Sequence, residues 1–266
     1  MTAAEHWRDQ LAGWAIPDHI AAAARESPWA MPVGYFARRA RRSVAQPVGA
    51  SYARAAEALD PPGSVLDVGA GAGAASLPLA PLTTDLTAVD TNADMLEALR
   101  EQAGVAVHTI EGRWPDVAAG APVADVVVCH HVFYNVPDLA DFALALTAHA
   151  RRRIVVELGE RHPLVVLSPL WTLFHGLDRP AGPTATDAVA VLREAGINPR
   201  EERWRRPPGA VDADDADLVE MTRRRLCLPP ERRDEVAEAL RAQPAGGGTD
   251  LVTLWWEPQV RSRTTL

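Results

Sequence analysis

The sequence predicts an α/β fold with a doubly wound parallel sheet, on two observations. Short apolar runs alternate along residues 64–158 with segments whose apolar residues recur at helical spacing. The first run, "SVLDVG", leads directly into the glycine-rich stretch "GAGAG", which is typical of a strand followed by a ligand-binding turn. Strands separated by helices require right-handed crossovers, and these place helices on both faces of a parallel sheet.

Five apolar runs are expected to be strands of this sheet: residues 64–69, 85–90, 105–112, 124–131 and 151–158. One helix is expected over residues 93–104, where the apolar residues share a face. Another is expected with Pro137 in its first turn. A helix is also expected to begin near Ala72, so that its free amides point at the bound molecule.

Composition and charge restrict the class of protein. The chain has 266 residues, of which 47 % are apolar and 23 % charged, and no apolar run is long enough to span a bilayer, so no membrane association is expected. The formal net charge of −8 disfavours a nucleic-acid partner and favours small molecules. All 27 basic residues are arginine. The absence of lysine excludes Schiff-base chemistry and a P-loop lysine.

The N-terminus and the cysteines indicate a cytoplasmic protein. Glu5 and Asp9 stand where a secretion signal carries positive charge. Cys129 and Cys227 lie far apart and have neither disulfide-framework nor metal-site spacing. Both are therefore expected to be buried thiols, and no metal site is expected.

The carboxyl ends of the expected strands should meet at one rim, where parallel sheets bind their ligands. The residues at this rim are Gly69, Asp90, Gly112, His130 and Glu157. Glycine permits unusual dihedral angles and close approach of a ligand to the backbone. Asp90 ends the second strand, where a carboxylate can accept hydrogen bonds from both hydroxyls of a ribose.

Two classes of enzyme share this pattern. In a nicotinamide-dependent oxidoreductase, the third glycine of the G-x-G-x-x-G fingerprint falls at Ala74, which is a tolerated variant. Asp67 before the glycines, together with the absence of the lysine that a Y-x-x-x-K pair needs, disfavours this class. A non-catalytic binding protein with the same fold is a third alternative.

The stretches "VLDVGAGAG", "LTAVD" followed by "TNADML", "EGRWPD" and "ADVVVCHHVFYNVPDL" resemble the class I S-adenosylmethionine-dependent methyltransferases, in this order and at this spacing. The resemblance is strong over about residues 60–160, continues through 188–204 and resumes at 250–258. It implies a Rossmann-like sheet of seven strands, the last antiparallel. It also implies S-adenosyl-L-methionine as cofactor, S-adenosyl-L-homocysteine as product, and in-line methyl transfer to an oxygen, nitrogen or carbon of a small-molecule acceptor.

The residues that resemble the family are expected to form a core, and the remaining residues to form additional helical segments. The core is expected over residues 56–207 and 249–260, with an N-terminal helical cap or lid over 1–55 and a helical insertion over 208–248. The insertion reads as two helices separated by Pro229 and Pro230, followed by a flexible "AGGGTD". It is expected to form a lid or a dimer surface, so a homodimer stays open.

The resemblance also implies a cofactor site. Its residues are Asp67, Gly69, Ala70, Gly71, Gly73, Asp90, Thr91, Asn92, Met95, Arg113, Trp114 and His130. The glycine turn would approach the methionine part, Asp67 the ammonium group, directly or through water, and Asp90 the ribose. Arg113 and Trp114 stand where many relatives carry an aspartate that recognises adenine, which leaves the backbone or Asp116 as alternatives.

His131 is the first candidate for a catalytic base, ahead of Glu157, His130 and His175. One histidine of the doublet must leave the inward face of its strand and so lie at the rim. The expected substrate residues are Phe36, Tyr134, Glu157, Trp171 and His175.

Two segments rich in proline and aromatic residues, 27–44 and 161–180, are expected to cover the rim, with ordinary helical packing as the alternative. For "ARRARR" (37–42), a solvated helix face is favoured over an anion site.

Overall fold

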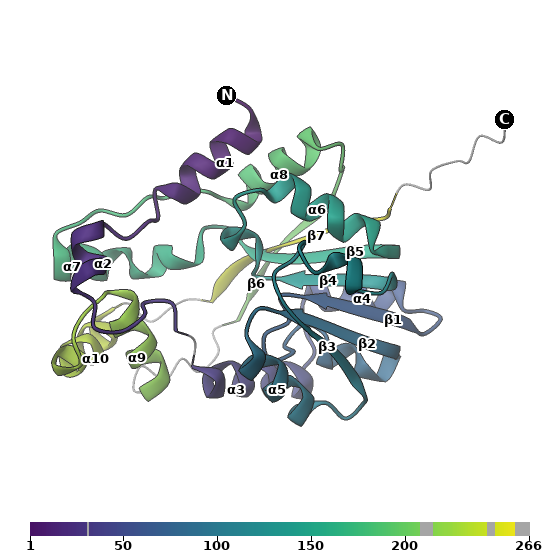
Figure 1. Cartoon of the computed structure of the whole chain (residues 1–266), viewed down its shortest axis with the longest axis horizontal. Coiled ribbons are helices and arrows are strands. Elements are labelled where there is room, and N and C mark those ends of the chain that lie inside the picture. The colour runs from purple at the N-terminus through teal and green to yellow at the C-terminus, as the bar shows by residue number, and fades with distance from the viewer. Residues whose placement is uncertain (31, 208–214, 244–247, 259–266) are drawn as a thin grey trace.

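The computed structural model describes residues 1–30, 32–207, 215–243 and 248–258, which form a seven-stranded sheet flanked by helices (Figure 1). The strand order is β3-β2-β1-β4-β5-β7-β6. The strands are β1 (Gly63–Val68), β2 (Thr83–Asp90), β3 (Val107–Glu111), β4 (Ala124–His130), β5 (Ala150–Gly159), β6 (Arg200–Arg206) and β7 (Thr249–Trp256). Strands β1 to β5 pair in parallel, whereas β7 is antiparallel to both β5 and β6. The expected Rossmann-like sheet with an antiparallel last strand is confirmed.

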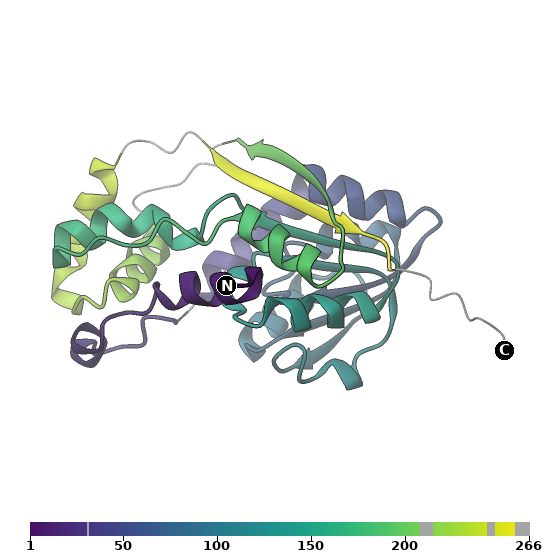
Figure 2. The ribbon, with the colours of Figure 1, turned by 90° about the horizontal axis from the view of Figure 1, so that it is seen from above.

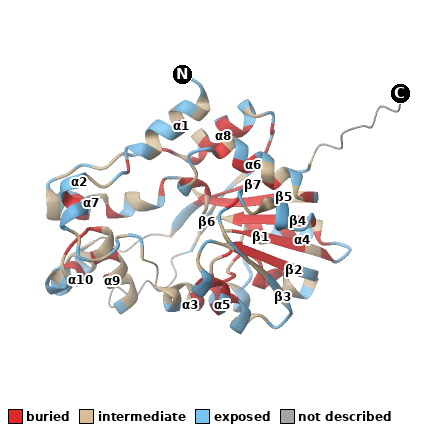
Figure 3. Cartoon of the chain, in the orientation of Figure 1, coloured by how far each residue is buried: buried red, intermediate tan, exposed pale blue. Residues whose placement is uncertain are grey.

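The sheet is buried on both faces, because successive side chains of a strand point to opposite sides. In β4, Val127 and Cys129 belong to one apolar layer, and Val126 and Val128 to the other. Figure 3 shows the central strands as a continuous buried layer. Helices α1 (Ala3–Ala12), α6 (Leu139–Ala148) and α8 (Ala185–Glu194) cover the first face, and α4 (Ala50–Ala58) and α5 (Ala93–Gln102) the second.

The helix expected near Ala72 is not formed, and this expectation is wrong. The chain continues from the glycines through turns into a 3₁₀ helix, η1 (Leu77–Leu82). Pro78 and Pro81 lack the N–H groups that an α-helix needs here, and Gly73 adopts a φ of 89°. In addition, Pro137 precedes α6 instead of lying in its first turn, since α6 begins at Leu139.

The N-terminal helix α1 is anchored in the main core. Trp7 is 0 % exposed, donates its Nε1–H to the carbonyl of Val136 at 2.8 Å, and stacks on Tyr134 with 5.6 Å between ring centroids. The amide of Ala3 donates to Glu194 of α8 at 2.7 Å. Helix α1 therefore packs on the layer that covers the sheet. Helix α4 spans the expected boundary at residue 55 and also packs on the sheet.

Four helices form a cap with its own apolar cluster, on one side of the sheet in both views (Figures 1 and 2). They are α2 (Asp18–Ala23), α7 (Ser168–His175), α9 (Ala216–Arg225) and α10 (Arg233–Ala242). Trp171 and Val219 are among the buried residues of this cluster. A short 3₁₀ helix, Pro230–Arg232, separates α9 from α10, as the proline pair predicts. Residues 245–247 of "AGGGTD" lie outside the described residues.

The longest helix of the described chain, α3 (Val33–Ala45), has 13 residues. A span of the bilayer needs about 20 apolar residues. None of the helices in the described ranges has the length and hydropathy to cross a membrane.

Replacement of Trp7 tests the anchoring of α1. Trp7→Ala removes a fully buried indole, its hydrogen bond and its stacking, and should lower the free energy of unfolding by about 3–5 kcal/mol in chemical denaturation. The control is Leu173→Ala, because Leu173 is 66 % exposed and its loss should change this free energy by no more than about 0.5 kcal/mol. Equal effects of the two substitutions would contradict the anchoring role.

Candidate active site

A cavity of about 1220 Å³ lies at the carboxyl ends of the strands, between the sheet and helices α3 and α9. The strand-end residues that line it are Gly69, Asp90, Gly112, His130 and Glu157, the same rim that the sequence predicts. Helix α3 contributes one face, with Tyr35, Phe36, Arg39, Arg42 and Ser43, and Gln46 follows at its C-cap. Residues three and four positions apart lie on one side of a helix, so α3 presents a continuous wall to the cavity.

The glycine turn brings the backbone to the cavity surface. Gly69 and Gly71 have positive φ angles of 73° and 51°, which residues other than glycine rarely adopt. A Cβ atom at Gly69 would lie 2.3 Å from Cγ2 of Val132, whereas one at Gly71 would have no atom within 4 Å. Gly69 is thus required by packing, and Gly71 leaves open space in front of the turn.

Asp90 joins this turn to the start of α5. Its Oδ2 accepts the amide of Gly71 at 2.7 Å, and its Oδ1 accepts the amide of Asn92 at 2.9 Å. A carboxylate oxygen can accept more than one hydrogen bond. Asp90 can therefore hold the turn and still accept donors from a pair of vicinal hydroxyls, as a ribose presents.

Asp67 lies beneath the turn and does not line the cavity. It is 0 % exposed, and burial raises its pKa to about 7. The nearby charge of Asp90 also raises this pKa, whereas Ser76 lowers it. Ser76 lies near enough to act on the pKa, but by distance and angle neither carboxylate oxygen forms a hydrogen bond in the described part of the chain. Buried polar atoms rarely stay unpaired. An ammonium group held at the turn, or a water between the two, fits this unpaired carboxylate.

The ends of β4 and β5 are bridged by His131 and Glu157. His131 has a φ of 61°, and its backbone N–H donates to the carbonyl of Glu157 at 2.7 Å. Its Nε2 lies 3.0 Å from Oε1 of Glu157, which also pairs with Arg206 at 2.6 Å. Because an ionised carboxylate only accepts hydrogen bonds, we assign the proton to Nε2, which leaves the lone pair on Nδ1.

The protonation states of His131 and Glu157 follow from their surroundings. Burial lowers the pKa of His131, and this exceeds the opposite effect of the hydrogen bond to Glu157. Burial acts to raise the pKa of Glu157, but the hydrogen bond from His131 and the charge of Arg206 hold it well below its usual value. At neutral pH the pair is therefore a neutral imidazole, 38 % exposed, and an ionised carboxylate.

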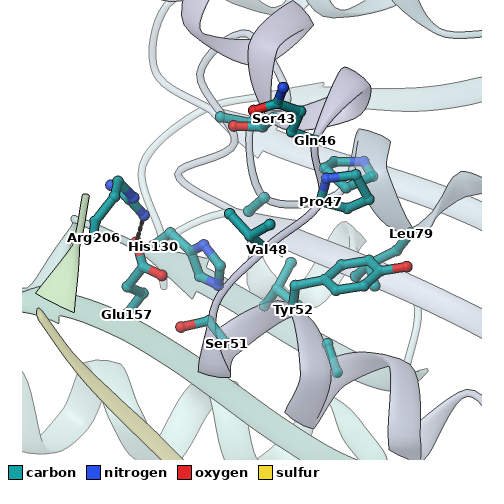
Figure 4. A pocket seen from close by; sticks show the side chains of 15 residues that line it. Ser43, Gln46, Pro47, Val48, Ser51, Tyr52, Leu79, His130, Glu157 and Arg206 are labelled. Atoms are coloured by element: carbon teal, nitrogen blue, oxygen red, sulfur yellow. Dashed lines mark hydrogen bonds and ion pairs between the residues drawn. The ribbon is translucent and has the colours of Figure 1, made fainter. Parts of the chain in front are cut away.

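His130 faces a side pocket of about 70 Å³ that shares His130, Glu157 and Arg206 with the main cavity. Figure 4 shows its ring next to Val48, with Ser51 and Tyr52 of α4 nearby and the Arg206–Glu157 pair at the edge. Burial lowers the pKa of His130 to about 4, and its Nε2 has no partner among the described residues. This imidazole is thus neutral and available to a small polar group.

Most of the residues expected around a cofactor line the cavity. They are Gly69, Ala70, Gly71, Asp90, Thr91, Asn92, Met95, Arg113, Trp114 and His130. The structure places two others behind this surface: Asp67, as described above, and Gly73, where a Cβ would lie 2.7 Å from Leu77. Asp116, the alternative for adenine, does not line the cavity.

The expected substrate residues divide into two groups. Phe36 and Glu157 line the cavity, as does His131. Tyr134, Trp171 and His175 do not, which corrects that expectation. Tyr134 donates to the carbonyl of Gly159 at 2.8 Å, and Nε2 of His175 lies 2.7 Å from the carbonyl of Leu226.

The expectation that residues 161–180 cover the rim is also wrong. None of these residues lines the cavity. The aromatic side chains of this segment pack against α9 and α10 in the cap, because those helices offer the larger apolar surface. The other expected lid, residues 27–44, contributes Trp29 and the α3 face.

Arg39, Arg206, Asn135 and Leu218 also line the cavity and were not among the expected site residues. The sequence carries a signal for Arg39, which follows Phe36 by three positions and so shares its helical face. No local signal identifies Leu218, since its place depends on how α9 packs. In the described residues no group of three or more histidine, cysteine, aspartate or glutamate side chains is arranged to hold a metal ion.

Comparison with protein families gives one match: residues 65–152 match the model of a methyltransferase domain. This stretch begins in β1, ends in β5, and includes the glycine turn, Asp90 and both histidines. A comparison with curated protein sequences finds no match.

The chain is also similar to solved structures of methyltransferases. A putative sarcosine dimethylglycine methyltransferase from Galdieria sulphuraria is 16 % identical, over 77 % of this chain and 82 % of that one, with a TM-score of 0.51. A SAM-dependent methyltransferase from Thiobacillus denitrificans, in complex with S-adenosyl-L-homocysteine, is 21 % identical, over 77 % and 90 %, with a TM-score of 0.49. Magnesium protoporphyrin IX methyltransferase from Synechocystis PCC 6803 is 16 % identical, over 82 % of each chain, with a TM-score of 0.48. At these identities the likeness concerns the fold alone.

The raised pKa of Asp67 predicts a distinct dependence of stability on pH. The unfolded chain loses this proton near pH 3.8, but the folded protein keeps it up to about pH 7. Stability that depends on Asp67 therefore falls as the pH rises between these values. Asp67→Asn removes this titrating group. As the pH rises from 5 to 7, the free energy of unfolding of the variant relative to wild type should therefore increase by about 1 kcal/mol per pH unit. Denaturant titrations at several pH values measure this, and a difference that stays constant would contradict the assignment.

Proposed function

We propose that this chain is a class I S-adenosylmethionine-dependent methyltransferase and that it transfers the methyl group to an oxygen, nitrogen or carbon atom of a small molecule held in the cavity. The match of residues 65–152 to a methyltransferase domain supports this proposal. The observation that carries the proposal is that the strand-end residues, α3 and Leu218 of α9 line one cavity. The methyltransferase match includes the glycine turn, which removes the oxidoreductase alternative that the glycine spacing allowed.

The residues of the β1 and β2 ends fit the cofactor. Asp90 would accept the ribose hydroxyls, the backbone at Gly69 and Gly71 would face the methionine part, and Asp67 would favour the ammonium group. When bound, S-adenosyl-L-methionine supplies an electrophilic methyl group on its sulfonium sulfur. The protein's own task is to hold the acceptor in line with this group and to exclude water.

The enclosure supports a small acceptor over a polymer. Arg38 of α3 pairs with Asp215 at 3.0 Å and with Asp217 at 2.9 Å. These ion pairs tie α3 to the start of α9. Phe36 and Leu218 supply apolar surface from the two helices. A compact molecule fits between these walls, whereas an extended chain needs an open groove.

His131 is proposed as the general base for acceptors that must lose a proton. The bond of Nε2 to Glu157 orients the ring, and the Nδ1 lone pair is available to the acceptor. The lowered pKa of His131 keeps this nitrogen unprotonated at neutral pH. Glu157 and Arg206 act as positioning residues, because Glu157 pairs with the ring of His131 and Arg206 pairs with Glu157.

Asp90→Asn tests the cofactor site. The amide replaces one acceptor oxygen by a donor and removes the charge, so the affinity for S-adenosyl-L-homocysteine in calorimetry should fall by at least about tenfold. Asp94→Asn is the control, because Asp94 is exposed nearby and does not line the cavity. Wild-type protein should bind this ligand and not NAD. Unchanged affinity in Asp90→Asn would contradict the assignment of this strand end.

His131→Ala tests the base. With a panel of small hydroxy and amino compounds as acceptors, S-adenosyl-L-homocysteine release by the variant should be slower by about a hundredfold, with cofactor affinity unchanged. In the wild type, the rate should fall on acidification at a lower pH than an ordinary histidine would give, because burial lowers the pKa of His131. Full activity of the variant would return His131 to a structural role, and methylation of a polymer without any small acceptor would contradict the substrate class.

A further inference from the structure

We propose that the methyl acceptor carries a carboxylate group and that Arg39 of α3 binds it, at the end of the cavity next to His131. This inference rests on the proposed function, because it assigns the substrate class of the same cavity. Arg39 belongs to the stretch "ARRARR", for which the sequence favoured a solvated helix face over an anion site.

Arg39 lines the cavity but has no carboxylate partner. Its nearest polar contact in the described structure joins a guanidinium nitrogen to Nε2 of His131 at 3.3 Å. Since Nε2 carries the proton that Glu157 accepts, this contact brings two donors together. Arg39 forms no ion pair with any described residue. The preceding Arg38, in contrast, is fully paired with Asp215 and Asp217.

Among the described residues, the charges around Arg39 leave this end of the cavity positive. Glu157 is already engaged by His131 and Arg206. Arg42, one helical turn after Arg39, lines the same cavity and adds another positive charge. Burial, together with the charge of Arg206, lowers the pKa of Arg39. Arg39 is half-buried. A partly buried charge without a partner is unfavourable, so an anionic ligand would balance this region.

The chemistry of the guanidinium group selects a carboxylate. Its planar fork can donate two parallel hydrogen bonds to one carboxylate, and such charge-assisted pairs are among the stronger polar contacts in proteins. Because Arg39 touches His131, the carboxylate would lie beside the base. The nucleophilic atom must then be only a few bonds from the carboxyl carbon, as in a compact amino or hydroxy acid.

The cofactor also carries a carboxylate, so the experiment must separate the two sources. We choose benzoate as the probe and benzamide as its uncharged counterpart, and measure both by calorimetry on protein saturated with S-adenosyl-L-homocysteine. Wild type should bind benzoate at least about tenfold more tightly than benzamide, as expected for charge-assisted pairing. Arg39→Met should abolish the difference and leave the affinity for S-adenosyl-L-homocysteine unchanged. Arg41→Met, an exposed position on the same helix that does not line the cavity, should retain the preference.

The outcomes distinguish the inference from its premise. Arg39→Met should also be no less stable than wild type in denaturation, because no ion pair is lost. Equal binding of benzoate and benzamide by wild type, or a preference that survives in Arg39→Met, would overturn the carboxylate site. A loss of S-adenosyl-L-homocysteine affinity in Arg39→Met would assign the arginine to the cofactor instead. Failure of wild type to bind S-adenosyl-L-homocysteine at all would contradict the proposed function itself.

Discussion

The burial of the central sheet on both faces is the constraint on which the rest of the structure depends. Apolar layers cover each side of β4 and β5, so polar side chains on these strands have access to solvent or ligand only at the ends. Parallel pairing then brings the carboxyl ends of β1, β2, β4 and β5 to one rim. The site is thus a consequence of how the core is packed, and its polar groups are fixed by the most rigid part of the molecule.

Three carboxylates near this rim have different properties because their surroundings differ. Asp90 accepts two backbone amides and remains at the cavity surface. Glu157 is held ionised by a histidine and an arginine. Asp67 forms no hydrogen bond of regular geometry with the described residues and keeps its proton up to about pH 7. The first can bind hydroxyl groups, the second can orient a base, and the third responds to a positive charge at the turn.

The cap illustrates how segments without regular patterns acquire a role. Residues of α2, α7, α9 and α10 are far apart in the chain but share one apolar cluster. The ion pairs of Arg38 connect this cap to α3, so the same helix that presents Arg39 to the cavity is held by its neighbour. Two adjacent arginines of one helix therefore face different partners: Arg38 the aspartates at the start of α9, and Arg39 the cavity.

The sequence by itself determined five strands of the parallel sheet, the glycine turn and the strand-end residues Asp90, His130 and Glu157, because these depend on local apolar runs and on the fixed geometry of parallel pairing. It also carried the resemblance to methyltransferases, through contiguous motifs. Only the tertiary structure decided that Trp171 and His175 serve the cap core, that Asp67 lies beneath the turn, and that Arg39 faces His131. Such placements depend on contacts between distant segments. Arg39 and His131, like Arg38 and Asp215, are more than ninety residues apart in the chain. Local patterns carry no information on which distant surfaces bury the most apolar area together.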